Sequence, residues 1–383
     1  MASHGTTSAA VASLGDSYAG VRVVVTGGAG FIGSHLVDAL LDFGASVTVL
    51  DDLSSGDADW LFRRVDESPE QLRVVHGSIL DRDALDDALE RASLAFHLAA
   101  MSSAVESVRE PERCFEVNAQ GTVETLQAAR VARLRRVVLA STAAVYGLDP
   151  ITPTREDAPL APITPYGASK AAAEAAMRAW PAAFEDIDTA SLRLFNVYGP
   201  RQRTGAGDEG AVVASFLDVL LRGERPTIFG DGEQTRDFVY VHDIVRAFLL
   251  AGARERPFNG QAMNIGGGTP TSVNRLLRAC AQACGKGDVA AAFAPPRVGD
   301  PRASCADASR AKREIGFDLG TSLGDGLAET VAWRRGGALE GGSREPSDSS
   351  DDPDDAGPDA ALEVCVRSAP CPRPRPRYEA KRD

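Results

Sequence analysis

The chain has 383 residues, a net charge of −13 and 44% hydrophobic residues. This size allows two domains or one large α/β unit, and the negative charge argues against a general nucleic-acid-binding surface. No apolar stretch reaches the length of a membrane span, and residues 1–20 lack the basic and apolar regions of a signal peptide. We therefore expect a cytoplasmic protein, with no membrane contact, whose residues 1–20 form a flexible leader.

The first predicted strand, residues 21–25, runs directly into a cluster of glycines. It is apolar and β-branched, and apolar residues at helical spacing follow the cluster. A strand, a glycine turn and a helix in this order form a dinucleotide-binding fingerprint, in which the helix N-terminus faces a pyrophosphate. The glycines of the turn are Gly27, Gly28, Gly30 and Gly33.

The second predicted strand, residues 46–50, ends in Asp51 and Asp52. A carboxylate at this distance from the glycine turn accepts hydrogen bonds from the adenosine ribose diol and repels a 2′-phosphate. The pattern therefore favours NAD(H) over NADP(H). The alternative interpretation is that Asp51 only begins a turn.

Strands and helices then alternate in a regular way. We expect strands at residues 71–75, 94–98 and 136–140, with helices at residues 81–92 and 112–132. This alternation predicts a mostly parallel, doubly wound sheet with right-handed crossovers.

The fourth strand ends in His97, Leu98, Ala99 and Ala100. The small side chains of the alanines leave room for a cofactor at the carboxyl edge of the sheet. His97 could be catalytic, but a hydrogen-bonded structural role is favoured.

The regular pattern ends near residue 195. We expect a first domain over residues 21–195, with 237–265 returning to it, and a smaller second domain over 196–236 and 266–335. Residues 336–383 are acidic and then basic and rich in proline, which predicts disorder: a solvated tail, or one that binds a partner.

The six cysteines and five histidines do not cluster, so we expect no disulfide framework and no metal site.

The chemistry is concentrated after the fifth strand. Thr142 follows that strand, while Tyr166 and Lys170 lie one helical turn apart on a later helix. A tyrosine has a pKa near 10, but a lysine ammonium and an oxidised nicotinamide beside it favour the phenolate. Thr142 could share a proton between Tyr166 and a substrate alcohol. Although a lone YxxxK pattern is common by chance, its combination with the nucleotide fingerprint is not.

With these motifs, the sequence resembles the extended short-chain dehydrogenase/reductase family, specifically its NAD-dependent nucleotide-sugar epimerases and dehydratases, and most of all the UDP-glucose 4-epimerase-like branch. The resemblance covers residues 21–335. Its motifs are TGGAGFIG (26–33), FHLAA (96–100), STAAVYG (141–147), YGASK (166–170), LRLFNVYGPRQ (192–202), GDGEQTRDFVYVHD (230–243), NIGGG (264–268) and RVGDPR (297–302). It implies a Rossmann fold with a smaller α/β domain that binds the nucleotide-sugar.

The resemblance also implies roles for individual residues. The catalytic group matches Thr142, Tyr166 and Lys170, and Lys170 also holds the nicotinamide ribose. The expected cofactor-binding residues are Gly27, Gly30, Phe31, Ile32, Gly33, Asp51, Ser78, Ile79, Ala99, Ala100, Asn118, Tyr166 and Lys170. The expected substrate-binding residues are Asn196, Arg236, Arg297, Asp300 and Ser304, where paired arginines suit a diphosphate.

Three departures from the family pattern bear on function. Many relatives have an Asp-Ile pair where this chain has Ser78 and Ile79, so the adenine contact is weakened. Related dehydratases carry acidic residues after the catalytic threonine, where this chain has Ala143 and Ala144. Dehydration is therefore disfavoured, and so is decarboxylation, because that branch has a glutamate in this stretch.

The sequence as a whole predicts an NAD-dependent UDP-hexose 4-epimerase. In this hypothesis Tyr166 removes the 4-hydroxyl proton, a 4-keto sugar turns over in the site, and hydride returns to its opposite face. The alternatives are a nucleotide-sugar 4-dehydrogenase or decarboxylase, a non-catalytic NAD(H)-binding regulator, or an assembly module acting through the tail. The resemblance further implies a homodimer formed through residues 112–132 and 166–180, and a small gatekeeper residue, Ser304, that admits N-acetylated sugars.

Overall fold

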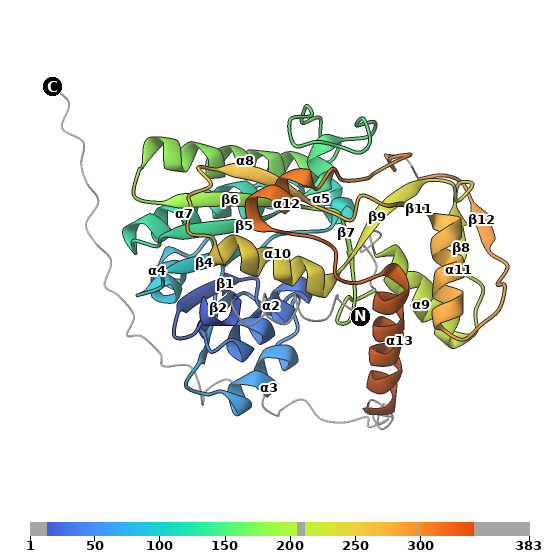
Figure 1. Ribbon diagram of the computed structural model, residues 1–383, viewed down its shortest axis with the longest axis horizontal. Coiled ribbons are helices and arrows are strands. Elements are labelled where there is room, and N and C mark those ends of the chain that lie inside the picture. The colour runs from blue at the N-terminus through green and yellow to red at the C-terminus, as the bar shows by residue number, and fades with distance from the viewer. Residues whose placement is uncertain (1–13, 205–210, 298, 341–383) are drawn as a thin grey trace, which may run out of the picture. The chain divides into compact units, whose positions relative to one another are not determined.

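The computed structural model describes residues 14–204, 211–297 and 299–340, and its centre is a seven-stranded sheet (Figure 1). The strands lie in the order β3-β2-β1-β4-β5-β6-β10, and every neighbouring pair is parallel. They are β1 (Arg22–Thr26), β2 (Ser46–Asp51), β3 (Leu72–His76), β4 (Leu94–His97), β5 (Arg136–Thr142), β6 (Asp188–Leu194) and β10 (Gln261–Ile265). The order reverses between β1 and β4, so this is the doubly wound Rossmann arrangement and the predicted fold is confirmed.

Helices cover both faces of the sheet because side chains of a strand point alternately to opposite sides. Val23 and Val25 pack into one hydrophobic cluster, while Val24 between them packs into another. The first face carries α2 (Phe31–Asp42), α3 (Asp59–Glu67), α10 (Val241–Ala253) and α12 (Ser309–Ile315). The second carries α4 (Arg82–Leu89), α7 (Gly121–Val131) and α8 (Pro165–Ala183).

The long helix predicted over residues 112–132 is present, but it contains a π-helical turn that the sequence did not predict. The chain forms α6 (Pro111–Phe115), a π-helical turn η1 (Glu116–Gln120) and then α7, after the short helix α5 (Ala104–Arg109). A π-helical turn widens the helix by one residue and is frequent at functional sites. Here it carries Asn118, one of the expected cofactor residues.

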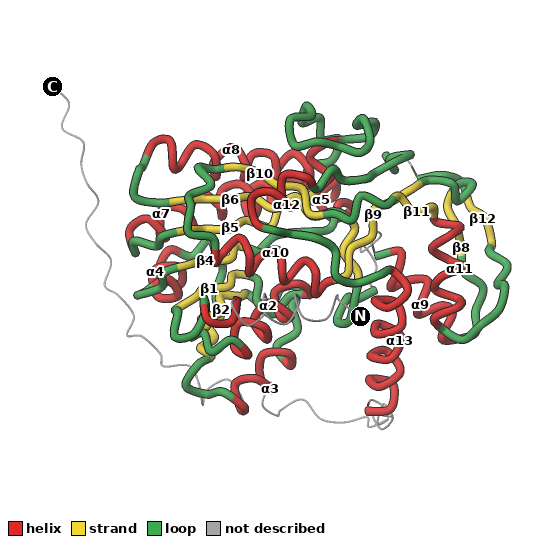
Figure 2. The backbone as a smooth tube through the Cα atoms, in the orientation of Figure 1, coloured by secondary structure: helices red, strands yellow, loops and turns green. Residues whose placement is uncertain are grey.

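A second region has its own hydrophobic cluster. It combines two small sheets with three helices that stand together at the right of the view in Figure 2. Its elements are β7 (Asn196–Tyr198), β9 (Thr235–Tyr240) and β11 (Pro270–Ser272) in one sheet, β8 (Thr227–Phe229) and β12 (Ala292–Ala294) in the other, and the helices α9 (Val212–Arg222), α11 (Val273–Ala283) and α13 (Leu323–Glu340). Phe31 and Ile32, at the start of α2, pack partly against this cluster. The N-terminus of α2 therefore borders both regions, while the exact domain division stays a prediction.

Both ends of the described chain differ from expectation. Residues 14–20 were expected in a flexible leader, but Tyr18 is fully buried and donates a hydrogen bond to the Leu249 carbonyl at 2.6 Å. The predicted leader is therefore wrong for these residues. The tail was predicted from residue 336, but residues 336–340 form the end of α13. The rest of the predicted tail, residues 341–383, lies outside the described residues. Among the described residues, no helix is long and apolar enough to cross a membrane.

Candidate active site

The glycine turn joins β1 to α2 at the carboxyl edge of the sheet. Gly27 has φ +72°, and a Cβ atom there would lie 2.6 Å from the backbone nitrogen of Ala99. Only glycine fits such a position, so the turn lies directly against the end of β4. Helix α2 then begins without a side-chain cap and without an acidic residue in its first turn. Its first N–H groups, from Phe31 onward, are thus available to an anion.

Asp51 connects the end of β2 to this turn. Its carboxylate accepts hydrogen bonds of 2.9 Å from the N–H groups of Ala29 and Leu53. Burial raises the pKa of Asp51, and the two backbone donors oppose that rise. A carboxylate has about four acceptor positions, so two remain for a ribose diol. Asp51 therefore begins the following turn and also contacts the glycine turn, while its role in binding the ribose stays a prediction.

The remaining expected cofactor residues lie along the same edge. Ser78 follows β3, where its hydroxyl accepts from the Leu80 N–H at 3.2 Å, and Ile79 is buried in the core. Ala99 donates its N–H to the Thr26 hydroxyl at 3.2 Å. Ala100 is the next residue, and neither alanine has a side chain that would fill the space above the sheet.

Asn118 is buried and already engaged within the protein. Its side-chain oxygen accepts from the Met101 N–H at 2.9 Å, and its amide donates to the Met101 carbonyl and to the Ser169 hydroxyl. The residue therefore fixes the chain after β4 to helix α8. Its predicted contact with the cofactor stays a prediction.

His97 has a structural role in this arrangement. Its two ring nitrogens lie 2.8 Å from the Thr26 hydroxyl and 3.1 Å from the Thr122 hydroxyl. Burial, with a smaller contribution from the Lys170 ammonium, lowers the pKa of His97 to about 3. The ring is thus neutral at physiological pH and connects β1, β4 and α7.

Three side chains from β5 and α8 form the chemical centre. Helix α8 begins at Pro165 after Thr164, whose hydroxyl caps it by accepting from the Gly167 N–H at 3.1 Å. Thr142, at the end of β5, accepts a hydrogen bond from the Ala144 N–H at 3.1 Å. Its hydroxyl also favours the ionised form of the Tyr166 phenol, although burial raises the pKa of Tyr166 overall.

Lys170 lies one turn along the same face of α8. Its ammonium donates to the Ala140 carbonyl at 3.0 Å, and burial lowers its pKa to about 8. The lysine therefore remains mostly cationic at neutral pH, close to the phenol that a cation would help to ionise.

A cavity of about 220 Å³ lies next to Thr142. Three of the expected substrate residues, Asn196, Arg236 and Ser304, line it. Ala143 and Ala144 line it as well, so the stretch that is acidic in related dehydratases is small and apolar here.

Arg297 and Asp300 do not line this cavity. Asp300 forms an ion pair with Arg236, and the Arg297 guanidinium lies 4.1 Å from the centre of the Phe229 ring. The five expected substrate residues are therefore gathered in one part of the second region, but two of them lie outside the cavity wall.

A buried polar network behind Thr142 was not predicted from the sequence. Glu174, one turn beyond Lys170 on α8, pairs with Arg193 on β6 and accepts from Ser141. The position of Glu174 on the same face as Tyr166 and Lys170 is the signal that could have identified it.

Comparisons with known proteins agree with this geometry. A model of the NAD dependent epimerase/dehydratase family matches residues 23–266. The chain belongs to this family. It is 42% identical to UDP-glucose 4-epimerase of Mycolicibacterium smegmatis over 317 residues, which are 82% of this chain and 99% of that protein.

Solved structures with similar folds include two sugar-nucleotide epimerases. UDP-glucose 4-epimerase of Thermotoga maritima, solved with UDP-glucose, has a TM-score of 0.77 and 38% identity over 83% of this chain and 99% of its own. UDP-N-acetylglucosamine 4-epimerase of Methanobrevibacter ruminantium, solved with UDP-N-acetylmuramic acid, has a TM-score of 0.78 and 35% identity over the same shares.

NAD is the cofactor of the family, and the residues described here fit it. The uncapped N-terminus of α2 suits the pyrophosphate, the free acceptor positions of Asp51 suit the adenosine ribose, and the small residues after β4 leave space for the nicotinamide half.

Proposed function

We propose that the protein is a UDP-hexose 4-epimerase that interconverts UDP-glucose and UDP-galactose through a 4-keto sugar. The observation that carries this proposal is the position of Thr142. Its hydroxyl lowers the pKa of Tyr166, and it also lines a cavity together with Asn196 and Arg236. A hydroxyl that acts on the proposed base and polar groups suited to a diphosphate thus lie at one cavity.

In the proposed reaction, Tyr166 takes the proton of the sugar 4-hydroxyl. The Thr142 hydroxyl would donate to the phenolate and stabilise it. A lysine cation one helical turn away would favour the phenolate as well. NAD, when bound, supplies reversible oxidation and reduction at C4. The epimerisation then requires the 4-keto sugar to turn while its nucleotide stays bound.

Holding the nucleotide is the role we propose for the second region. Asn196, Arg236 and Arg297 would contact the diphosphate, and Asp300 would accept from the nucleotide ribose. Asp237, next to Arg236, holds the surrounding loops by accepting from the N–H groups of Gly267, Gly268 and Ala306. The proposed nucleotide-binding residues are therefore attached to a backbone that Asp237 holds in place. The nucleotide would stay fixed while only the sugar turns.

A nucleotide-sugar 4-dehydrogenase or decarboxylase on the same scaffold is the nearest alternative, and a non-catalytic NAD(H)-binding regulator is a further one. The small apolar side chains of Ala143 and Ala144 in the cavity wall favour the epimerase over a dehydratase, because they offer no acid or base for removing water.

The test is incubation with UDP-, dTDP-, GDP- and ADP-sugars, followed by sugar analysis. An epimerase gives the same mixture from either epimer, with no net NADH and no change in mass. Net NADH or a mass loss would instead identify a dehydrogenase or decarboxylase, and a complete lack of turnover would favour the regulator.

We also propose that the protein is a homodimer, paired through α6, η1, α7 and α8. Apolar side chains of these helices are exposed: Phe115 on α6 is 41% exposed and Val131 on α7 is 69% exposed. Isologous packing of such helices would bury them in a four-helix bundle.

The cytoplasmic location stays a prediction that cell fractionation would test.

A further inference from the structure

Glu174 stands at the meeting point of the elements that carry the catalytic side chains. It is only 4% exposed and lies on α8 one turn beyond Lys170. Its carboxylate receives two kinds of donor. The Arg193 guanidinium binds it in a fork, at 2.9 Å to Oε1 and 2.7 Å to Oε2, and the Ser141 hydroxyl donates to Oε1. Helix α8 is thus tied to both β5 and β6.

Ser141, which bonds to Glu174, is the residue directly before Thr142 in the chain. It is buried, it precedes Thr142 in β5, and in the sheet register it faces Arg193 on β6. A hydrogen bond from Ser141 to Glu174 therefore fixes the end of β5 against the helix that carries Tyr166. The distance between the Thr142 and Tyr166 hydroxyls depends on how these two elements sit against each other.

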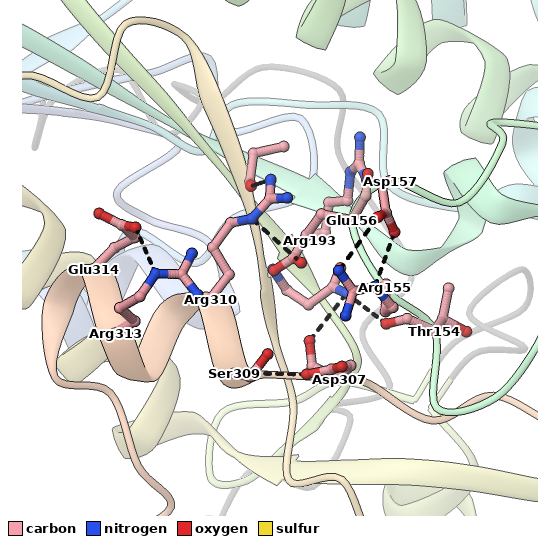
Figure 3. A network of polar contacts seen from close by, with 12 residues as sticks. Thr154, Arg155, Glu156, Asp157, Arg193, Asp307, Ser309, Arg310, Arg313 and Glu314 are labelled. Atoms are coloured by element: carbon pink, nitrogen blue, oxygen red, sulfur yellow. Dashed lines mark hydrogen bonds and ion pairs between the residues drawn. The ribbon is translucent and has the colours of Figure 1, made fainter.

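Arg193 extends the network to the cavity wall. Its Nη1 donates to the Tyr146 hydroxyl at 2.7 Å and to the Glu156 carbonyl at 3.1 Å. Tyr146 closes the 3₁₀ turn η2 (Ala143–Tyr146), which lines the cavity, and donates to Asn264 at 2.6 Å. Figure 3 shows Arg193 beside Glu156, with Arg310 of α12 reaching towards the Glu156 carboxylate. Arg193 therefore contacts both Tyr146, in the wall of the sugar cavity, and Glu174, on the helix that carries Tyr166 and Lys170.

We infer that Glu174 and Arg193 are positioning residues for the epimerase reaction: through Ser141 they fix Thr142, at the end of β5, against the helix that carries Tyr166, and through Tyr146 they hold the wall of the sugar cavity. This inference rests on the proposed function for its kinetic readout. Neither residue contacts the reacting atoms.

A second buried ion pair, at the other end of β5 and β6, offers a matched control. Arg136 on β5 pairs with Asp188 on β6, with 2.6 Å between Nε and Oδ2, and their side chains are 3% and 12% exposed. They lie at the opposite end of these strands from Thr142. Breaking this pair should reduce stability in the same way, because it also leaves a charge without its partner. It should not disturb the catalytic side chains.

The first experiment compares Ser141→Ala with Asp188→Asn in the full-length protein. Ser141→Ala keeps both charges of the network and removes only the tether to β5. We expect its kcat to fall about 10- to 100-fold with KM little changed, because small displacements of reacting groups have effects of this size. Asp188→Asn should lower the melting temperature but keep kcat. Equal kcat in wild type and Ser141→Ala would overturn the inference.

A second experiment separates charge from position. The titratable or charged groups that face Tyr166 and Lys170 within the described chain are Glu174 on α8, Cys114 on α6, His97 on β4 and, behind Glu174, Arg193 on β6. The Glu174 charge raises the pKa of Lys170 against the larger effect of burial. Glu174→Gln should therefore move the alkaline limb of the kcat profile to lower pH, by about one unit. Ser141→Ala and Asp188→Asn should leave that limb in place, and an unmoved limb in Glu174→Gln would count against the role of Glu174.

A readout without turnover keeps the inference testable if the proposed function fails. The Thr142 hydroxyl lowers the pKa of Tyr166, so moving Thr142 away should raise that pKa. Ultraviolet titration of tyrosinate, with Tyr166→Phe subtracted, should show this rise in Ser141→Ala and not in Asp188→Asn. Lack of turnover by wild type would reject the epimerase proposal alone, whereas an unchanged Tyr166 titration in Ser141→Ala would reject the positioning role.

Discussion

The carbonyl oxygen of Gly27 would lie 2.0 Å from a Cβ atom placed on Gly33. The first turn of α2 thus rests directly on the glycine turn, with no room for a methyl group. We predict that Gly33→Ala forces the two apart, which should cost about 1–3 kcal/mol of unfolding free energy and weaken NAD binding. Denaturant unfolding and the NAD content of the purified protein measure the two effects.

Gly287→Ala is the control for this change. A Cβ atom at Gly287 would meet nothing within 4 Å, so the same substitution there should leave stability and NAD content close to wild type. Should Gly33→Ala retain a full complement of NAD, the close approach would not be what shapes the cofactor site.

Tyr166→Phe removes the proposed proton acceptor and keeps the aromatic ring. General acid–base groups contribute about 10²–10⁴ in rate, so turnover should fall by at least the lower figure while NAD remains bound. Tyr240→Phe is the control, because the Tyr240 hydroxyl bonds to Glu329 in the second region. Near-normal epimerisation by Tyr166→Phe would exclude it as the base.

The parts of this site that the sequence predicts are those set by neighbouring residues. The glycine turn needs close spacing within one strand–helix unit, and Tyr166 and Lys170 need only one helical turn between them. The structure has the glycine turn between β1 and α2, and it has Tyr166 and Lys170 on α8 as expected. Spacing along the chain is enough to predict these two features, because the geometry of one turn and of one helix fixes where their residues lie relative to each other.

Relations between distant segments could not be predicted in this way. The pairing of Glu174 with Arg193 depends on how α8 packs on β6, and the pairing of Arg236 with Asp300 depends on how a loop folds back on β9. The burial of Tyr18 depends on its contact with Leu249, far along the chain. No periodic pattern encodes such contacts, so each required the three-dimensional structure.

Asp51→Ala should weaken NAD binding and narrow any preference for NAD over NADP. Hydrogen bonds to a charged group contribute about 1.5–3 kcal/mol, so affinity should fall about tenfold or more. Because Asp51 also accepts from Ala29 and Leu53, Asp51→Asn serves as a milder variant that keeps an acceptor oxygen. Calorimetry with both cofactors measures the effect, and unchanged affinities in Asp51→Ala would contradict the ribose-binding role.

Phe115→Glu should convert the proposed dimer into a monomer. Phe115 is 41% exposed on α6, and a carboxylate there would have to be buried against the partner subunit. Ile151→Glu is the control, since Ile151 is 89% exposed in a loop outside these helices. Light scattering at micromolar concentration should report a dimer for wild type and for Ile151→Glu. A monomeric wild type would refute the proposed pairing.

Ser304 is the residue on which we base the choice of sugar. It lines the cavity beside Thr142, and its N–H donates to the Thr235 carbonyl at 3.1 Å, so its backbone is held in place by β9. A serine leaves more room than a tyrosine, and its hydroxyl could bond an acetamido oxygen. We predict that the wild-type protein epimerises UDP-N-acetylglucosamine as well as UDP-glucose.

Ser304→Tyr should fill that space and selectively abolish turnover of the N-acetylated sugar, while UDP-glucose is still epimerised. Ser304→Ala is the matched control: it keeps the room, loses only the hydroxyl, and should accept both sugars. Rates for the two substrates, measured side by side for the three proteins, decide the matter. If Ser304→Tyr loses both activities equally, or wild type never accepts the acetamido sugar, then another side chain borders the sugar's C2 substituent and Ser304 is not the gatekeeper.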